Sequence, residues 1–302
     1  MGKVIANSVA ELIDRFLKEV APTRYLDQSA NGIKSRGEKC ANLVKFFGTM
    51  SPSSLKTTHG YQYLDLRAQS GAPEAANKEM SLMRVICTQA VKWGLIDSNP
   101  FMSMEANRTD KVTRDITRRQ VTRFYLWAVR QEDLQARTTG TAAMFSFLTG
   151  FRSTEVRNFL KSGVTERGVV LLNAKRKMGE HRVMKLREWS SKLKCVVERA
   201  KQREDKVPSI FLFATERKPN AYTRHGWGAV WRSVWARYLG LEEKFVTAHP
   251  EYFSLQDIRP ASITEKFERR TADVYDFAAH ANPATTHRHY DRRRVNSAKA
   301  LD

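Results

Sequence analysis

The sequence predicts a mainly α protein in two parts: an N-terminal helical bundle, then a mostly helical α+β domain with a small antiparallel sheet. Three observations lead to this prediction. Apolar residues recur at helical spacing through roughly the first hundred positions. Strand patterns are confined to two short stretches, 169–172 and 182–186. The 302 residues, of which 41% are hydrophobic, are enough for two domains and at least one large core.

Helical signals dominate the first part. Ser8 and Glu11 have the spacing of a capping box and open the first helix. The last helix is the best defined, because an apolar stripe runs along it and Gly94 follows where a C-terminal glycine cap belongs. We interpret that stripe as ordinary core packing. Four helices are predicted here: the first begins at Ser8, and the others cover 39–47, 61–68 and 76–91.

The second part begins after a polar and basic stretch without apolar periodicity, which we interpret as an exposed linker at 107–116. Thr117 and Gln120 then form a second capping-box pattern at the start of a helix. The two strand patterns flank a basic turn at 173–180. The other predicted helices lie at 141–148, 189–201, 223–239, from Pro260 onward and around Tyr290.

The positive charge of the chain is concentrated in the second part. The formal net charge is +20. Residues 1–106 contain 13 basic against 10 acidic residues, whereas residues 107–302 contain 39 against 22. Solubility alone does not require this segregation, but a surface that grips phosphates does. The predicted partner is therefore a polyanion, held mainly by the second part.

Composition also limits the cellular setting. No uncharged apolar run is long enough for a membrane helix, and the N-terminus lacks the hydrophobic stretch of a signal peptide. Cys40, Cys87 and Cys195 are scattered and odd in number, as in proteins of reducing compartments. We expect a cytoplasmic, DNA-associated protein of bacterial, phage or mobile-element origin, without a membrane partner.

Four motifs contain residues suited to phosphodiester chemistry. A guanidinium matches a phosphate in a forked two-bond geometry, so Arg152 and Arg259 could clamp one phosphodiester. A tyrosine beside them could attack the phosphorus. Singly, each residue has an ordinary explanation as a surface or packing group, and only their fixed order favours a shared role. The motifs are T-G-F-R-S-T-E at 149–155, Q-D-I-R at 256–259, A-A-H at 278–280 and T-T-H-R-H-Y at 285–290.

This order and spacing resembles the tyrosine recombinase (phage integrase) family, whose motif runs T-G-x-R-x-x-E, H-x-x-R, G-H and Y. The stretch A-V-K-W-G-L-I-D-S-N-P at 90–100 is similar to the end of that family's core-binding domain. The resemblance covers about nine tenths of the chain. It implies a SAM-like, DNA-binding core-binding domain at 1–106, a basic linker at 107–116 and a catalytic domain at 117–302.

The resemblance also implies roles for individual residues. Tyr290 would be the nucleophile, and a lysine of the basic turn the general acid. K-M-G at 177–179 matches the usual K-T-G best, which favours Lys177 and leaves Lys175 as the alternative. Gln256 stands where the family usually has a histidine, and A-A-H replaces L-G-H. The implied catalytic set is Arg152, Lys177, Gln256, Arg259, His280 and Tyr290, with Glu155 orienting Arg152 or a neighbour.

The implied function is site-specific recombination of double-stranded DNA through a 3′-phosphotyrosyl intermediate. It implies a homotetramer in the synaptic complex and leaves room for an accessory DNA-bending or directionality factor. No cofactor is predicted, because no carboxylate or cysteine completes a metal site with the histidines and no Gly-rich phosphate loop is present. The alternatives are a transposon-borne recombinase, a type IB-like topoisomerase, and a DNA-binding relative that has lost catalysis.

Overall fold

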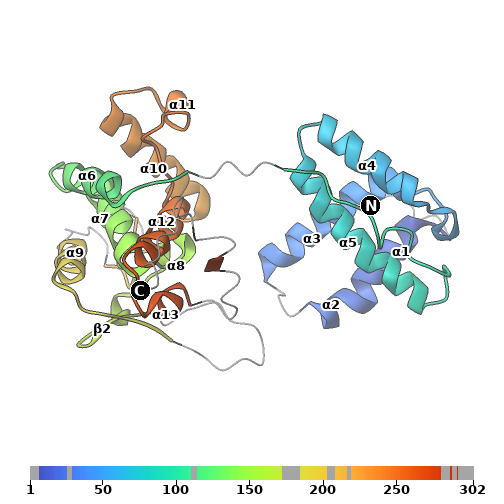
Figure 1. The fold of residues 1–302 in the computed structure, drawn as a ribbon, viewed down its shortest axis with the longest axis horizontal. Helices are drawn as coiled ribbons and strands as arrows, with labels where there is room; N and C mark the ends of the chain where they lie inside the picture. Colours follow the sequence, from blue (N-terminus) through green and yellow to red (C-terminus); the bar gives the residue numbers. More distant parts are fainter. Residues whose placement is uncertain are drawn as a thin grey trace, which may run out of the picture. The chain divides into compact units, whose positions relative to one another are not determined.

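The computed structural model describes residues 7–25, 29–109, 114–171, 184–202, 208–215, 219–279, 286–287 and 291. These residues fall into two compact units, one made of residues up to Val112 and one that begins at Thr113 (Figure 1). Across the described ranges the protein is mainly helical, with one three-stranded antiparallel sheet, which confirms the predicted fold class. The domain boundaries at 106 and 116 stay a prediction. No helix in these ranges is long and apolar enough to cross a membrane.

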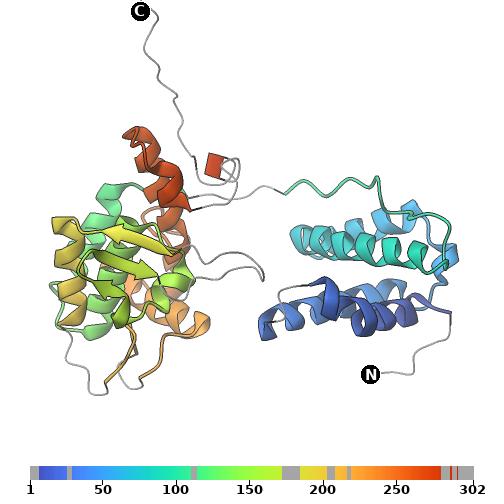
Figure 2. The ribbon, with the colours of Figure 1, turned by 90° about the horizontal axis from the view of Figure 1, so that it is seen from below.

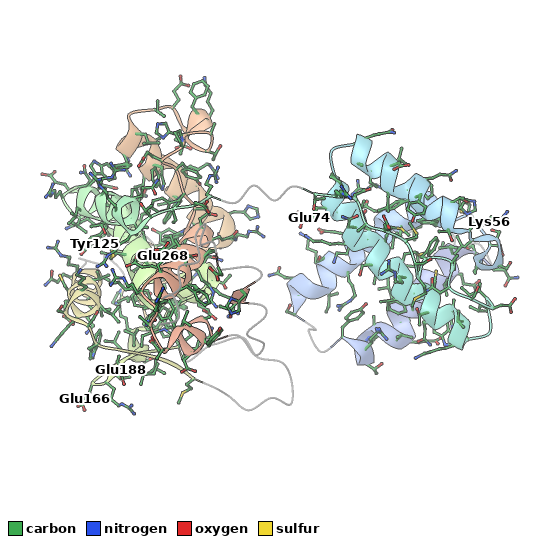
Figure 3. All side chains as sticks on the ribbon, in the orientation of Figure 1. Lys56, Glu74, Tyr125, Glu166, Glu188 and Glu268 are labelled. Atoms are coloured by element: carbon green, nitrogen blue, oxygen red, sulfur yellow. The ribbon has the colours of Figure 1, made fainter. Side chains whose placement is uncertain are left out.

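The first unit is a helical bundle whose core is lined by the predicted stripe of its last helix. Ala76, Met83 and Cys87 in this stripe are fully buried. Lys56 and Glu74 lie at the starts of the last two helices, α4 and α5. Figure 3 shows these two residues at opposite ends of the unit, as expected for an antiparallel pair of helices. The elements are α1 (Val9–Arg15), the π-helical turn η1 (Phe16–Val20), α2 (Ala21–Arg24), α3 (Ala30–Phe47), the 3₁₀ turn η2 (Pro52–Ser54), α4 (Thr57–Gln69) and α5 (Pro73–Lys92).

One buried carboxylate joins three of these helices. Glu79 on α5 accepts hydrogen bonds from Asn42 Nδ2 at 2.7 Å, from the Tyr63 hydroxyl at 2.6 Å and from two guanidinium nitrogens of Arg67 at 3.0 Å. Burial raises the pKa of the Glu79 carboxyl, but these donors outweigh it and hold the pKa below its ordinary value. Glu79 is therefore an ionised, fully bonded group in an otherwise apolar core.

Helix ends in this unit differ in part from the prediction. Helix α3 begins at Ala30, nine residues before the predicted start, because the Ser29 hydroxyl caps it by accepting the Gly32 N–H at 3.2 Å. Ser8 caps α1 as predicted, but the Glu11 carboxylate accepts from the N–H of Asn7 at 2.6 Å. Gly94 adopts φ +70°, as its predicted capping position after α5 requires.

The second unit is built around a central buried helix, α7, which packs against α6, α8, α9, α10 and α12. Gly140 permits the close approach of α6, since a Cβ at this position would lie 2.4 Å from the Cβ of Ala128. The helices are α6 (Arg118–Ala128), α7 (Leu134–Thr149), α8 (Ser153–Arg157), the 3₁₀ turn η3 (Lys161–Gly163), α9 (Ser191–Lys201), α10 (Arg224–Leu239), α11 (Glu243–Val246), α12 (Leu255–Glu268) and α13 (Val274–Ala278).

The sheet of this unit consists of β1 (Val164–Thr165), β2 (Gly168–Leu171) and β3 (Lys185–Glu188), antiparallel and in sequence order. Leu171 pairs with Lys185, and Val169 pairs with Arg187. Figure 2 shows the strands together on one side of the helices, and Figure 3 places Glu166 and Glu188 at the same end of the unit. The register puts Lys185 and Arg187, two residues apart on β3, on one face of the sheet.

Several elements of the second unit correct the prediction. Helix α12 begins at Leu255 instead of Pro260, because Ser254 and Asp257 form a capping box and Pro260 is accommodated in the second turn. The sequence prediction also missed β1, α8, α11 and α13, each of five residues or fewer. Short elements make too few turns or alternations for a periodic pattern to show. The predicted helix around Tyr290 lies outside the described residues.

Candidate active site

The turn between α7 and α8 gives the site its frame. Gly150 ends α7 with φ +65°, a left-handed conformation that favours glycine. A Cβ on Gly150 would also lie 2.5 Å from the Phe277 ring, so the close approach of α13 independently requires glycine. The Thr149 hydroxyl donates to the Phe145 carbonyl at 2.7 Å and accepts the Phe151 N–H at 3.3 Å. These bonds fix the turn that leads into Arg152.

Arg152 lies at the first position before α8, where Glu155 holds it. The Glu155 carboxylate accepts the Arg152 backbone N–H at 2.7 Å and its Nη1 at 3.1 Å. The Arg152 side chain is 42% exposed, whereas that of Glu155 is 8% exposed. The contact between Arg152 and Glu155 is therefore present, as the sequence indicated, and it leaves the guanidinium facing partly outward.

Lys185, at the start of β3, is a second cation held by the same carboxylate. Its Nζ lies 2.7 Å from Glu155 Oε1, and both side chains are buried. Burial lowers the pKa of Lys185, Glu155 opposes this, and the charges of Arg152 and Arg259 lower it further. Burial raises the pKa of Glu155, but Lys185 and the Arg152 N–H outweigh it and hold the pKa below its ordinary value. Glu155 is therefore an ionised centre between two cations.

Arg259 reaches the same turn from α12. Its side chain is buried, with Nη1 donating to the Gly150 carbonyl and Nη2 to the Ala278 carbonyl. Because Arg259 contacts the carbonyl of Gly150, two residues before Arg152, the structure brings these two predicted arginines to the same turn. Arg259 thus ties the end of α7 to the end of α13, the segment that leads to His280.

Arg187 is a further arginine at this place. It donates from Nε to the Thr149 carbonyl and from Nη2 to the Phe277 carbonyl, both at 2.7 Å. Burial and the Arg259 charge lower the pKa of the Arg187 guanidinium to about 10, while Glu155, Asp273 and Asp276 oppose the shift. Arg187 therefore connects the same two segments as Arg259, from β3 instead of α12.

Of the remaining predicted catalytic residues, the structure describes Gln256. Gln256 is exposed in the first turn of α12, one turn before Arg259, on the wall of a cavity that also includes Ser153 and Thr154. Lys177, its alternative Lys175, His280 and Tyr290 lie outside the described residues, so their places in the site stay predictions.

Sequence reasoning missed Lys185 and Arg187. The strand predicted at 182–186 contains the first of them and ends one residue before the second. Side chains two residues apart on a strand share a face. A search for paired cations along that strand would have found both, although only the fold shows that this face turns toward Glu155 and Thr149.

Two described tyrosines bear on the choice of nucleophile. Tyr252 is buried against the Trp235 ring, with centroids 5.4 Å apart. Tyr275 on α13 is 42% exposed, and its hydroxyl lies 2.8 Å from His287 Nε2. Tyr275 is thus the accessible one of the two and the proper comparison for Tyr290.

The arrangement can bind an anion. Arg152, Lys185, Arg187 and Arg259 gather around the α7–α8 turn, and Glu155 is the buried carboxylate among them. Charges in a poorly solvated place require countercharge. A phosphodiester supplies that charge and has the oxygen geometry that guanidinium groups recognise.

No protein-family model and no curated protein sequence matches this chain. Solved structures of integrases do match. A lambda integrase dimer bound to a COC′ core site aligns with a TM-score of 0.74 and 14% identity, covering 98% of this chain and 100% of that chain. A variant of the Tn1549 transposon integrase in complex with transposon right end DNA aligns with a TM-score of 0.76 and 16% identity, covering 96% of each chain. A lambda integrase tetramer bound to a Holliday junction aligns with a TM-score of 0.71 and 15% identity, covering 97% of this chain and 81% of that chain. The chain has the fold of these integrases.

Proposed function

We propose that this chain is a site-specific DNA recombinase of the tyrosine recombinase family, which breaks and rejoins double-stranded DNA through a 3′-phosphotyrosyl intermediate. The strongest support is the excess of positive charge at the α7–α8 turn, where Arg152 and Lys185 contact Glu155 while Arg187 and Arg259 bond backbone carbonyls. The two arginines that the sequence motifs single out are both in this cluster. The fold shared with DNA-bound integrases supports the same conclusion.

In this proposal Arg152 and Arg259 bind the non-bridging oxygens of the scissile phosphate and stabilise the charge that grows in the transition state. Arg152 presents the more exposed guanidinium, and Arg259 adds its charge from the buried side. Glu155 orients Arg152 and Lys185. Because Lys185 is buried in an ion pair, we assign it a positioning role and keep Lys177 as the general acid, with Lys175 as its alternative.

Tyr290 is the proposed nucleophile, and His280 a hydrogen-bond donor to the phosphate or the attacking oxygen. As its oxygen attacks phosphorus, Tyr290 releases its hydroxyl proton to water. The P–O bond to tyrosine forms and the bond to the 5′ oxygen breaks, and that oxygen takes a proton from Lys177. The reverse attack by a 5′ hydroxyl rejoins the strand and regenerates the tyrosine. Because the phosphotyrosyl bond conserves the energy of the broken bond, the proposed cycle uses neither metal nor ATP.

Gln256 replaces the histidine usual at its position, and its amide can donate a hydrogen bond but cannot titrate near neutral pH. We therefore assign it phosphate binding without proton transfer. Gln256→His should keep cleavage within about tenfold, and Gln256→Ala should lose on the order of a hundredfold, as when one transition-state donor is removed. Single-turnover cleavage by the three proteins compares them directly.

The proposed assembly is a homotetramer on two duplexes, in the cytoplasm, with an accessory DNA-bending or directionality factor as a further partner. A nicked duplex that traps the cleaved state tests the proposal. The wild-type chain should give a protein–DNA adduct that survives denaturation, and Arg152→Ala should not. A wild-type chain that binds DNA and never forms an adduct contradicts the proposal and favours a DNA-binding relative without catalysis.

Adduct formation alone does not separate a recombinase from a relaxing topoisomerase, since both chemistries pass through the same intermediate. Two duplexes carrying the same target site should exchange strands and yield a Holliday junction. Relaxation of a supercoiled circle that lacks the site, without strand exchange between sites, would favour the topoisomerase. The same assay on transposon ends and on phage attachment sites distinguishes the two recombinase settings.

A further inference from the structure

A second basic site lies next to the α7–α8 turn, in a cavity among α8, α10 and α12 (labelled in Figure 1). Its volume is about 350 Å³. The walls combine three arginines, buried aromatic rings and small polar side chains. The lining residues are Ser153, Thr154, Arg157, Arg224, Trp227, Gly228, Trp231, Arg232, Tyr252, Ser254, Leu255 and Gln256.

The charge of this cavity is unbalanced. None of the described residues that line it is acidic. Arg157 is 8% exposed and donates from Nη1 to the Tyr222 carbonyl at 2.9 Å, a neutral acceptor. Burial and the neighbouring Arg224 charge both lower the pKa of the Arg157 guanidinium. A buried cation beside a like charge is unfavourable unless an anion joins them.

The remaining wall groups suit a phosphate better than a base. The hydroxyls of Ser153 and Thr154 can donate to phosphate oxygens. The rings of Trp227, Trp231 and Tyr252 are themselves buried, so their faces offer little area on which a base could stack.

We infer that this cavity binds a backbone phosphate of the DNA strand, next to the phosphate held by Arg152. The inference rests on the proposed function and extends its substrate contacts by one site. Ser153 and Thr154 directly follow Arg152, and Gln256 lies one turn before Arg259, so the cavity and the candidate active site share the starts of α8 and α12. A strand that crosses Arg152 would present its neighbouring phosphate here.

The two exposed arginines of the cavity provide the test, because their loss should not disturb the core. Arg224→Gln, Arg232→Gln and the double variant, made in the full chain, are compared with wild type for duplex binding across a range of salt concentrations. Each arginine that contacts phosphate should lower the slope of log affinity against log salt by about 0.9. Affinity at low salt should fall on the order of tenfold per arginine, as for the loss of a charged hydrogen bond. Arg130→Gln is the matched control, since Arg130 is exposed and lies outside the cavity.

Three outcomes would overturn the inference. In the first, the double variant keeps the wild-type slope. In the second, Arg130→Gln loses as much as the cavity variants, which would indicate general charge attraction. In the third, the wild-type protein melts at a higher temperature in inorganic phosphate than in chloride of equal ionic strength, and the double variant does not. The double variant nevertheless keeps the wild-type slope of log DNA affinity against log salt. This last result would assign the cavity to a free phosphate.

The proposed function is tested separately with the trapping substrate. A wild-type chain that forms the covalent adduct while the double variant keeps its slope contradicts only the cavity inference. A wild-type chain that forms no adduct while the slope falls as expected contradicts the recombinase proposal and supports the phosphate site.

Discussion

Arg187 and Arg259 donate hydrogen bonds to neighbouring carbonyls of the same two segments. Arg187 bonds the carbonyls of Thr149 and Phe277, and Arg259 bonds those of Gly150 and Ala278. One arginine comes from β3 and the other from α12. The end of α7, which leads to Arg152, is thereby fixed to the end of α13, which leads to His280. The Arg259 charge lowers the pKa of the Arg187 guanidinium, so a further anion at this place would be favourable.

Arg187→Met should impair both stability and cleavage. The substitution keeps an apolar stem and leaves the Thr149 and Phe277 carbonyls without this donor, at a cost of about 2–3 kcal/mol in the free energy of unfolding. Cleavage of the nicked duplex should fall at least about tenfold in conditions where the variant is folded, because the Arg152 turn loses one of its two arginine ties to α13 and keeps only that of Arg259. Arg187→Lys should recover part of the loss in cleavage, since one charged donor returns.

Arg237→Met is the control for this change. Arg237 is an arginine of α10 with a 2.9 Å ion pair to Asp133 at the surface, so its loss should cost well under about 1 kcal/mol and leave cleavage unchanged. Denaturant unfolding and single-turnover cleavage measure the two effects. Wild-type cleavage by folded Arg187→Met would show that Arg187 does not position the site.

Gly150→Ala should be among the most damaging single-methyl changes in this unit. The new Cβ would lie 2.5 Å from Phe277 Cε1 and would occupy a left-handed conformation. Conformational strain and overpacking together should cost about 2–4 kcal/mol of unfolding free energy. Gly240→Ala is the matched control, because Gly240 has φ +67° at the end of α10 and a Cβ added there would meet no atom within 4 Å. Equal losses in the two variants would show that the contact with Phe277 is unimportant.

Ala279→Gly should stabilise the second unit. Ala279 ends α13 with φ +47° and ψ +50°, a conformation that costs an L residue roughly 1–2 kcal/mol and costs glycine little. After the entropy that glycine loses on folding, the expected gain is about 0.5–1 kcal/mol in a denaturant titration. Ala278→Gly, one residue earlier and inside the helix, should instead lose about 1 kcal/mol. Destabilisation by Ala279→Gly would contradict the left-handed conformation.

The sequence predicted those parts of the fold that have long patterns or paired caps. The stripe of α5 and the Thr117–Gln120 capping box of α6 are examples, and both are present. The start of α12 was misplaced because Pro260 resembles a first-turn proline, whereas the Ser254–Asp257 pair that begins the helix was overlooked.

The candidate site was predictable only in part. Arg152 and Arg259 stand in recognisable motifs, and the structure brings them together. Lys185 and Arg187 belong to no such motif, and their place depends on the pairing of β3 with β2, which turns one face of the strand toward Glu155. Long-range pairing of this kind has no local pattern in the sequence, so the fold was needed to find them.

The stability of the first unit should depend on pH through Glu79. Its pKa is lowered in the folded state, so the stabilisation is present above the ordinary value of 4.5 and is lost as pH falls through the lower folded value. Glu79→Gln should remove this acid dependence and cost about 2 kcal/mol at neutral pH, because Arg67 loses its ionised partner but still reaches solvent. Denaturant titrations between pH 3 and 7 compare the wild-type protein with Glu79→Gln. An unchanged acid dependence in Glu79→Gln would assign it to other carboxylates.

Identification of the amino acid joined to DNA tests the central claim most directly. The adduct trapped on a nicked duplex is digested with protease, and the DNA-linked peptide is sequenced by mass spectrometry. The proposal predicts one linkage, from the Tyr290 oxygen to a 3′ phosphate, and no adduct in Tyr290→Phe under conditions where that variant still binds DNA. Tyr275→Phe, which removes the exposed hydroxyl beside His287, should keep the adduct. A linkage through Tyr275 or any residue other than Tyr290, or to a 5′ phosphate, would contradict the account.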